Sequence, residues 1–265
     1  MKFPFFIVNA FCKNSFSGNP AGVCILEEWL STNELQNIAS QTCLPETAFV
    51  FPNTNNSWSI RWFTPITEVD LCGHATLAAA YVLFEEGAIG LNDSFSFSSF
   101  TGKIETKILA NNSISLNLPA MHLGKASASP LLIESLGAYP DEIYLEKDCL
   151  CIFGDEEIIH QLKPDFRLLA GLSRVRGVIV TSETSRIGYH FVSRFFCPRI
   201  GIDEDQATGS SHCMLGPFWG GKLNKTKMVG WQASQRGAEI RCELENKRVI
   251  LSGNSEIFVR GKMNI

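Results

Sequence analysis

The 265-residue chain lacks the features that mark several large classes of protein. No segment reaches the ~18 consecutive apolar residues that a transmembrane helix needs, so we expect no membrane association. Lysine and arginine number 23 against 27 acidic residues, and a net charge of −4 offers no basic surface to nucleic acid. The apolar N-terminus is short and contains Pro4 and Asn9, which is more typical of a strand than of a signal peptide. We therefore predict a cytoplasmic protein.

Motifs for cofactors and metals are also missing. The chain contains no glycine-rich dinucleotide motif, no P-loop, no HExxH and no GxSxG. The spacing of its histidines is not that of metal ligands. Nine cysteines, an odd number, predict reduced thiols rather than a disulfide framework. We therefore predict a protein that uses neither a cofactor nor a metal ion.

What the chain does contain is a large apolar fraction arranged in short strand-like segments. Forty-five per cent of the residues are hydrophobic and 19% are charged, which suits a well-packed core. Several segments alternate apolar and polar residues, as half-buried antiparallel strands do. We expect strands at 3–8, 22–26, 48–51, 58–63, 103–109, 113–118, 150–153, 177–181, 189–196, 248–251 and 256–260. This pattern predicts an α+β fold.

Three segments predict helices among these strands. Residues 31–42 begin with Ser31 and Glu34, which together form a capping-box signature. Residues 73–86 are apolar on every face and are followed by Gly87, as expected of a helix buried inside the protein. Residues 209–219 form a second segment of this kind, which we expect to end at Pro217.

The two apolar helices share a plan that suggests an internal repeat. Each begins at a glycine, Gly73 or Gly209, with an acidic residue, Asp70 or Asp205, shortly before it. The glycines are 209 − 73 = 136 residues apart, close to half the chain. We predict an N-terminal half of residues 1–120 and a C-terminal half of residues 121–265, joined by a linker at 119–129, with the last strand able to pack on the first half.

The starts of these two helices could bind an anion. A helix begins with unpaired N–H groups and a partial positive charge, and a glycine there lets a ligand approach closely. The ordinary alternative is that nearby polar side chains only cap their own helices. The candidates for such caps are Asp70, Thr76, Ser210 and Ser211. The sequence leaves both interpretations open.

Four other side chains carry possible chemistry. Glu46 opens an apolar segment, where partial burial would suit it to proton transfer, although it could equally be a solvated loop residue. His74 could be catalytic or a satisfied core residue, and Asp205 could be functional or part of a solvated acidic loop. Cys72 beside a helix start would have a lowered pKa if it were accessible, but it could also fill the core.

The order of the motifs resembles the phenazine-biosynthesis-like (PhzF) family of isomerases. The segments that carry the resemblance are 16–23 (FSGNPAGV), 44–50 (LPETAFV), 60–65 (IRWFTP), 68–77 (EVDLCGHATL) and 205–212 (DQATGSSH). The segments 235–237 (QRG) and 251–253 (LSG) also look like those of the family. The matches together run from about residue 5 to about residue 260 in the family's order. The resemblance implies a fold related to diaminopimelate epimerase, with two similar halves, each a strand-rich, barrel-like roll around a central buried helix. It also implies an active site in the cleft between the halves.

The resemblance assigns roles to seven residues. Glu46 matches the family's acid/base carboxylate, and His74 and Asp205 match its supporting polar groups. The residues matching positions that hold the substrate are Gly73, Gly209, Ser210 and Cys72. Related epimerases use one cysteine from each half, but residues 206–208 provide no second thiol.

These inferences together predict a cofactor-independent isomerase. The substrate would be a small carboxylate-bearing metabolite, and the reaction a proton shift or an epimerisation with Glu46 as acid and base. Two alternatives stay open: an amino-acid racemase that uses Cys72, and a non-catalytic interaction protein that keeps the fold. We expect no nucleic-acid or membrane partner and consider a homodimer possible.

Overall fold

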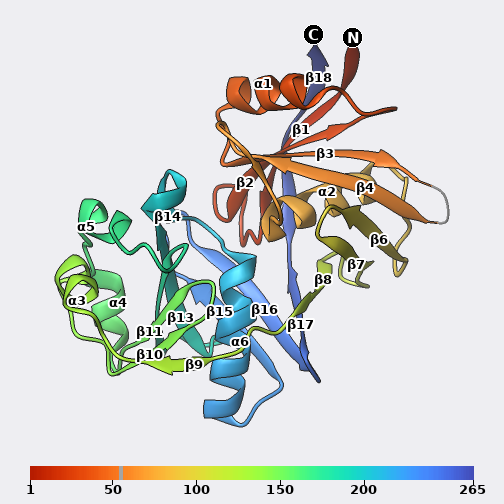
Figure 1. Ribbon diagram of the computed structural model, residues 1–265. Helices are drawn as coiled ribbons and strands as arrows, with labels where there is room; N and C mark the ends of the chain where they lie inside the picture. The colour runs from red at the N-terminus through yellow and green to blue at the C-terminus, as the bar shows by residue number, and fades with distance from the viewer. Residues whose placement is uncertain (54–55) are drawn as a thin grey trace. The chain divides into compact units, whose positions relative to one another are not determined.

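Strands make up most of the regular structure, as the alternating segments predict. The computed structural model describes residues 1–53 and 56–265 (Figure 1). The strands are β1 (Lys2–Ala10), β2 (Asn19–Ile25), β3 (Glu46–Pro52), β4 (Ser57–Phe63), β5 (Glu68–Val69), β6 (Ser94–Ser99), β7 (Gly102–Ile108), β8 (Ile114–Pro119), β9 (Gly124–Ala126), β10 (Glu142–Leu145), β11 (Cys149–Ile152), β12 (Val178–Glu183), β13 (Phe191–Cys197), β14 (Ile202–Asp205), β15 (Lys227–Gln232), β16 (Ala238–Glu245), β17 (Arg248–Gly253) and β18 (Ser255–Asn264). The predicted mixture of helices and a predominant sheet is therefore confirmed.

Helices are fewer and differ in burial. They are α1 (Thr32–Thr42), α2 (Gly73–Glu85), α3 (Pro130–Leu136), α4 (Glu156–Gln161), α5 (Phe166–Ala170) and α6 (Gly209–Leu223), with one short 3-10 turn at Pro198–Ile200. Among the described residues, no helix has both the length and the apolar character needed to cross a bilayer.

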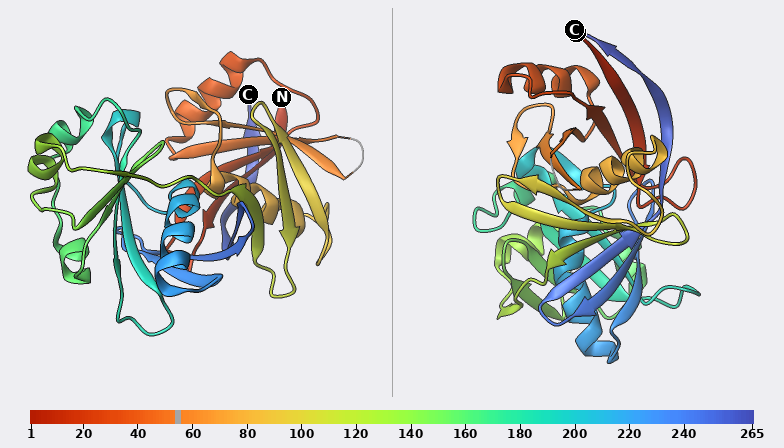
Figure 2. Two further views of the ribbon diagram at one scale, coloured as in Figure 1. Left: turned by 60° about the horizontal axis from the view of Figure 1, so that its bottom comes forward. Right: turned by 90° about the vertical axis from the view of Figure 1, so that its right-hand side faces the viewer.

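The chain divides into two compact units. Unit 1 comprises Met1–Leu118 together with Ile250–Ile265, and unit 2 comprises Pro119–Val249. Strand β18 returns to unit 1 and pairs antiparallel with β1, from Lys2 opposite Asn264 to Ala10 opposite Ser255. The two ends of the chain therefore lie side by side within unit 1 (Figure 2).

The strands of the two units pair in the same order and in the same directions. In unit 1, β2 is parallel to β3, β3 is antiparallel to β4, and β4 is antiparallel to β5 and parallel to β6. In unit 2, β11, β12, β13, β14 and β15 repeat this sequence of pairings. Helix α2 follows β5, and helix α6 follows β14. Corresponding positions of the two units can therefore be compared through their strands.

Helix α1 forms as its sequence predicts. Ser31 is the N-cap and accepts a hydrogen bond from the Glu34 N–H, while the Glu34 carboxylate accepts one from the Ser31 N–H, completing the capping box. The buried stripe of Leu35, Ile38 and Ala39 packs into an apolar cluster of unit 1. Burial of each large side chain in the stripe contributes about 1.5–3 kcal/mol, which fixes the helix on β3 and β4.

Helix α2 is buried almost throughout, as its uniform apolarity predicts. Nine of its residues are buried, from His74 to Leu83. Glu86 is the C-cap, and Gly87 follows with φ +74°, a conformation that glycine adopts without strain.

The prediction that Pro217 ends the second apolar helix is wrong. Helix α6 continues to Leu223 with Pro217 inside it. Proline removes one helical N–H and leaves the carbonyl four residues earlier, that of Cys213, without its usual partner. The Met121 N–H donates to this carbonyl at 2.9 Å, so the freed acceptor is satisfied within unit 2.

The expected linker at 119–129 is tied to unit 2 instead of running free. Strand β9 lies within it and pairs with β10, and the Ala120 N–H donates to the Lys247 carbonyl. Helices α3, α4 and α5, which we did not predict, lie together at one side of unit 2 (Figure 1). Local signals were present for α3, which has Ser129 as N-cap, Pro130 in its first turn and Gly137 as C-cap.

Candidate active site

The first group of candidate residues surrounds the start of α2 in unit 1. Glu46 is the first residue of β3, and the parallel pairing with β2 sets it opposite Ala21. His74 is the second residue of α2, and Cys72 is its N-cap. The Glu46 Oε2 and His74 Nε2 atoms lie 3.2 Å apart, and both side chains are largely buried. Two elements distant in sequence thus bring a carboxylate and an imidazole together.

Asn19, at the start of β2, determines the orientation of the imidazole. Its Nδ2 group donates to His74 Nδ1 at 3.1 Å, and the Cys72 sulfur lies 3.5 Å from the same nitrogen. An amide N–H can only donate, so Nδ1 is the acceptor in neutral His74 and Nε2 carries the proton. The Glu46 Oε2 atom lies 3.2 Å from this nitrogen. Our sequence interpretation did not single out Asn19, although it lies within the segment FSGNPAGV.

The buried position of this group changes the acidity of two of its members. Burial alone would lower the pKa of the His74 imidazole, but the adjacent Cys72 sulfur and Glu46 carboxylate raise it well above its usual range. Burial, reinforced by the negative charge of Glu46, raises the pKa of the Cys72 thiol. The lowered pKa that an accessible Cys72 would have does not arise, because this thiol is buried. Cys72 is therefore a protonated neighbour of His74 and a poor base.

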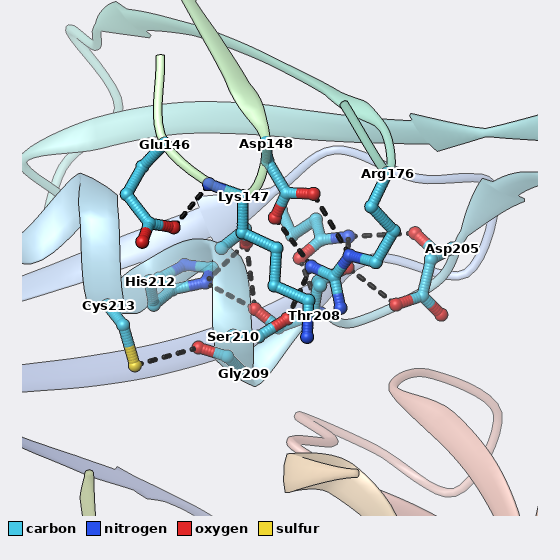
Figure 3. Close-up of polar contacts among 12 residues, drawn as sticks. Glu146, Lys147, Asp148, Arg176, Asp205, Thr208, Gly209, Ser210, His212 and Cys213 are labelled. Atoms are coloured by element: carbon cyan, nitrogen blue, oxygen red, sulfur yellow. Dashed lines mark hydrogen bonds and ion pairs between the residues drawn. The ribbon is translucent and has the colours of Figure 1, made fainter. Parts of the chain in front are cut away.

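The second group surrounds the start of α6 in unit 2. Thr208 is the N-cap, and its hydroxyl donates to the Asp205 carboxylate at 2.6 Å. The Gln232 side chain accepts from the Thr208 N–H and donates to the Asp205 carbonyl. Arg176 donates through Nη2 to the Ser210 hydroxyl oxygen at 2.8 Å (Figure 3). Asp205 and Ser210 thus lie at the same helix start, as predicted, together with Gln232 and Arg176, which we did not predict.

Both helix starts lack a side-chain cap. Neither Cys72 nor Thr208 forms a side-chain cap hydrogen bond to its helix. The hydroxyls of Thr76 and Ser211 instead donate to the carbonyls of these two N-cap residues, at 2.6 and 2.8 Å. A hydroxyl that donates to a carbonyl does nothing for the N–H groups of the first turn. Thr76 and Ser211 therefore do not act as simple caps of their helices.

The group in unit 1 also contains possible metal ligands. The donor atoms of Glu46, Cys72 and His74 all lie within 4.8 Å of one another. Both nitrogens of the imidazole, however, already face a partner, with Asn19 donating to one and Glu46 close to the other. The expectation that the protein uses no metal stays a prediction.

Comparison with known proteins identifies the family. The model of the phenazine biosynthesis-like protein family (PhzC-PhzF) matches residues 8–261. An uncharacterized isomerase of Halalkalibacterium halodurans is 39% identical over 99% of both chains, and a human phenazine biosynthesis-like domain-containing protein is 33% identical over 99% of both. The crystal structure of a PhzF-family protein from Enterococcus faecalis matches with a TM-score of 0.95 and 38% identity over 100% of both chains. These relatives identify the chain as an isomerase, and it belongs to the phenazine biosynthesis-like family.

The likeness in fold extends further than the likeness in sequence. A probable proline racemase of Agrobacterium radiobacter matches with a TM-score of 0.65 at 9% identity, covering 99% of this chain and 92% of the racemase. At that identity the match concerns the fold alone. It agrees with the fold relationship to epimerases that the sequence motifs imply.

Proposed function

We propose that the protein is a cofactor-independent isomerase that moves a proton on a small carboxylate-bearing metabolite. The observation that carries the proposal is the pairing of Glu46 with His74 at the uncapped start of α2. Glu46 would remove a proton from a substrate carbon and return it to another carbon or to the same one. His74, whose Nε2 atom lies 3.2 Å from Glu46 Oε2, would orient the carboxylate.

The helix starts would stabilise the negative charge that develops on the substrate. Neither N-cap residue, Cys72 or Thr208, caps its helix through its side chain, so the first-turn N–H groups at Gly73 and Gly209 can donate to an anion. Asp205 and Ser210 would hold polar groups of the same substrate, and Cys72 would line the site.

The chemistry of Cys72 argues against the racemase alternative. A thiol acts as a base only after it loses its proton, and burial beside Glu46 raises the pKa of this thiol. The residues before Gly209, residues 206–208, contain no second thiol. The presence of an acid/base pair also disfavours a purely non-catalytic role, because a binding scaffold needs no buried carboxylate beside an imidazole.

Solvent-deuterium incorporation tests the proposal. The enzyme is incubated in D₂O with a panel of small cyclic and amino carboxylates, and label is detected by mass spectrometry. For a substrate found in this way, Glu46→Gln keeps the shape of the side chain but cannot accept a proton. It should lower exchange roughly 10²–10⁴-fold while the substrate still binds.

Cys72→Ala is the matched control, because it alters the same group of residues without removing the proposed base. We expect exchange to fall by less than about tenfold, since a buried protonated thiol contributes little to acid–base catalysis. Wild-type exchange in Glu46→Gln, together with loss of exchange in Cys72→Ala, would replace this proposal with the racemase.

A further inference from the structure

An ion pair in unit 2, between the partly exposed Arg176 and the buried Asp148, reaches the start of α6. Arg176 donates from Nε and Nη2 to the two carboxylate oxygens of Asp148, at 2.9 and 2.5 Å. The Asp148 side chain is fully buried, and the Phe195 ring lies 5.1 Å from the guanidinium carbon. The same Nη2 group donates to Ser210 (Figure 3). The guanidinium is therefore held in one orientation by a bidentate partner and an aromatic face.

The strand pairing allows Arg176 to be compared with Glu46 in unit 1. Glu46 begins β3, which is parallel to β2, and contacts the second residue of α2. Arg176 lies two residues before β12, which is parallel to β11, and contacts Ser210, the second residue of α6. The strand registers place Val178 where unit 1 has Thr47, so Arg176 lies one residue before the counterpart of Glu46. The start of this strand thus directs a carboxylate to the helix in one unit and a guanidinium to the helix in the other.

The hydrogen bond from Arg176 determines how the Ser210 hydroxyl can act. A serine hydroxyl has one proton to donate, and a guanidinium N–H cannot accept it. Ser211, the next residue, uses its own proton on the Thr208 carbonyl. Among the described residues, the Ser210 hydroxyl has no such acceptor, so its proton stays available beside the uncapped helix start.

We infer that Arg176, held by Asp148, is a positioning residue that makes Ser210 a donor to the carboxylate of the substrate. The inference rests on the proposed function, since it specifies how that site holds its anion. We do not expect Arg176 to bind the substrate itself, because its charge is paired with Asp148 and its Nε and Nη2 groups donate to Asp148 and Ser210. Its effect on binding must therefore pass through Ser210.

Titration calorimetry with benzoate tests the inference, and neutral benzamide is the parallel probe. Ser210→Ala should weaken benzoate binding about tenfold, the effect of one hydrogen bond to a charged group, and should leave benzamide unaffected. Arg176→Lys keeps the positive charge opposite Asp148 but loses the planar guanidinium that donates to Asp148 and Ser210 together. This variant should therefore weaken benzoate binding severalfold. The double variant should bind no more weakly than Ser210→Ala alone.

Arg61→Lys is the matched control. Arg61 forms a bidentate pair with Glu68 in unit 1, with both distances at 2.6 Å, and is remote in sequence from α6. This variant should bind benzoate as the wild type does. If Arg176→Lys does not fold, Arg176→Gln combined with Asp148→Asn removes both charges of the pair together and takes its place.

The outcomes separate this inference from the proposed function. Additive effects of Ser210→Ala and Arg176→Lys, or unchanged benzoate binding in Arg176→Lys, would overturn the inference while the proposed function stands. A wild-type protein that binds benzoate no better than benzamide would refute the carboxylate site of the proposed function, and this inference with it.

Discussion

Protonation of His212 should destabilise the protein in mild acid. This residue lies inside α6, fully buried, with its Nδ1–H donating to the Thr208 carbonyl at 2.8 Å. Its Nε2 atom has no hydrogen-bond partner among the described residues, and a Cβ on Gly230 would come within 3.1 Å of it. Burial lowers the pKa of His212 to about 4. A second proton would thus be placed where nothing can accept it.

The size and sign of the effect follow from this pKa. The unfolded chain titrates near the ordinary histidine value of about 6.5, so it binds more protons than the folded chain between pH 6.5 and 4. The contribution to stability is therefore complete above pH 6.5 and is lost as the pH falls toward 4. A difference of about 2.5 pKa units corresponds to about 3 kcal/mol.

Urea unfolding at several pH values between 7 and 4 measures this loss. His212→Asn keeps a donor near the Thr208 carbonyl but does not titrate, so its free energy of unfolding should fall by about 3 kcal/mol less than that of the wild type over this range. The comparison with the variant is needed because His74 changes the free energy of unfolding in the opposite direction. The pKa of His74 is raised, so its contribution to stability is present below pH 6.5 and is lost as the pH rises. Replacement of the exposed His122 by Asn is the control. A difference between wild type and His212→Asn that stays constant from pH 7 to pH 4 would refute the reasoning.

Two further predictions concern α1 and the thiols. Ser31→Ala removes the N-cap of α1 and should lower the free energy of unfolding by about 1 kcal/mol. The control, Ser40→Ala on the exposed face of the same helix, should change the free energy of unfolding by less than about 0.5 kcal/mol. Equal effects of the two variants in urea titrations would contradict the capping assignment. Cys43 is exposed, whereas Cys72 is buried. A thiol reagent should therefore react rapidly with Cys43 in the native protein, and mass spectrometry that finds Cys72 labelled as fast would contradict the burial described above.

The sequence predicted best those features that depend on residues close together in the chain. The capping box of α1 involves Ser31 and Glu34, and the uniform apolarity of α2 is visible within one segment. Pro217 misled the prediction for α6 because the residue that accommodates it, Met121, lies far away in sequence. No local pattern reports that a distant N–H will satisfy the carbonyl freed by a proline.

The candidate site shows the same limit on what can be predicted from the sequence. Glu46, His74 and Asp205 were found because they lie in motifs shared with a family, and the residues alone left their roles open. Arg176 and Asp148 lie 28 residues apart and belong to none of these motifs. They meet because β11 and β12 pair in parallel, a fact about the sheet that no spacing in the sequence reveals.

The repeated pairing order also explains why two similar helix starts should differ in chemistry. The electrostatic field of the first-turn N–H groups is alike at the N-termini of α2 and α6. The neighbouring side chains therefore decide what each helix N-terminus binds. At α2 the Glu46 carboxylate lies 3.2 Å from the imidazole, and a second anion placed there would be repelled. At α6 the neighbouring groups are Arg176, which is paired with Asp148, and the available Ser210 proton. A carboxylate should therefore bind more strongly at the start of α6 than at the start of α2.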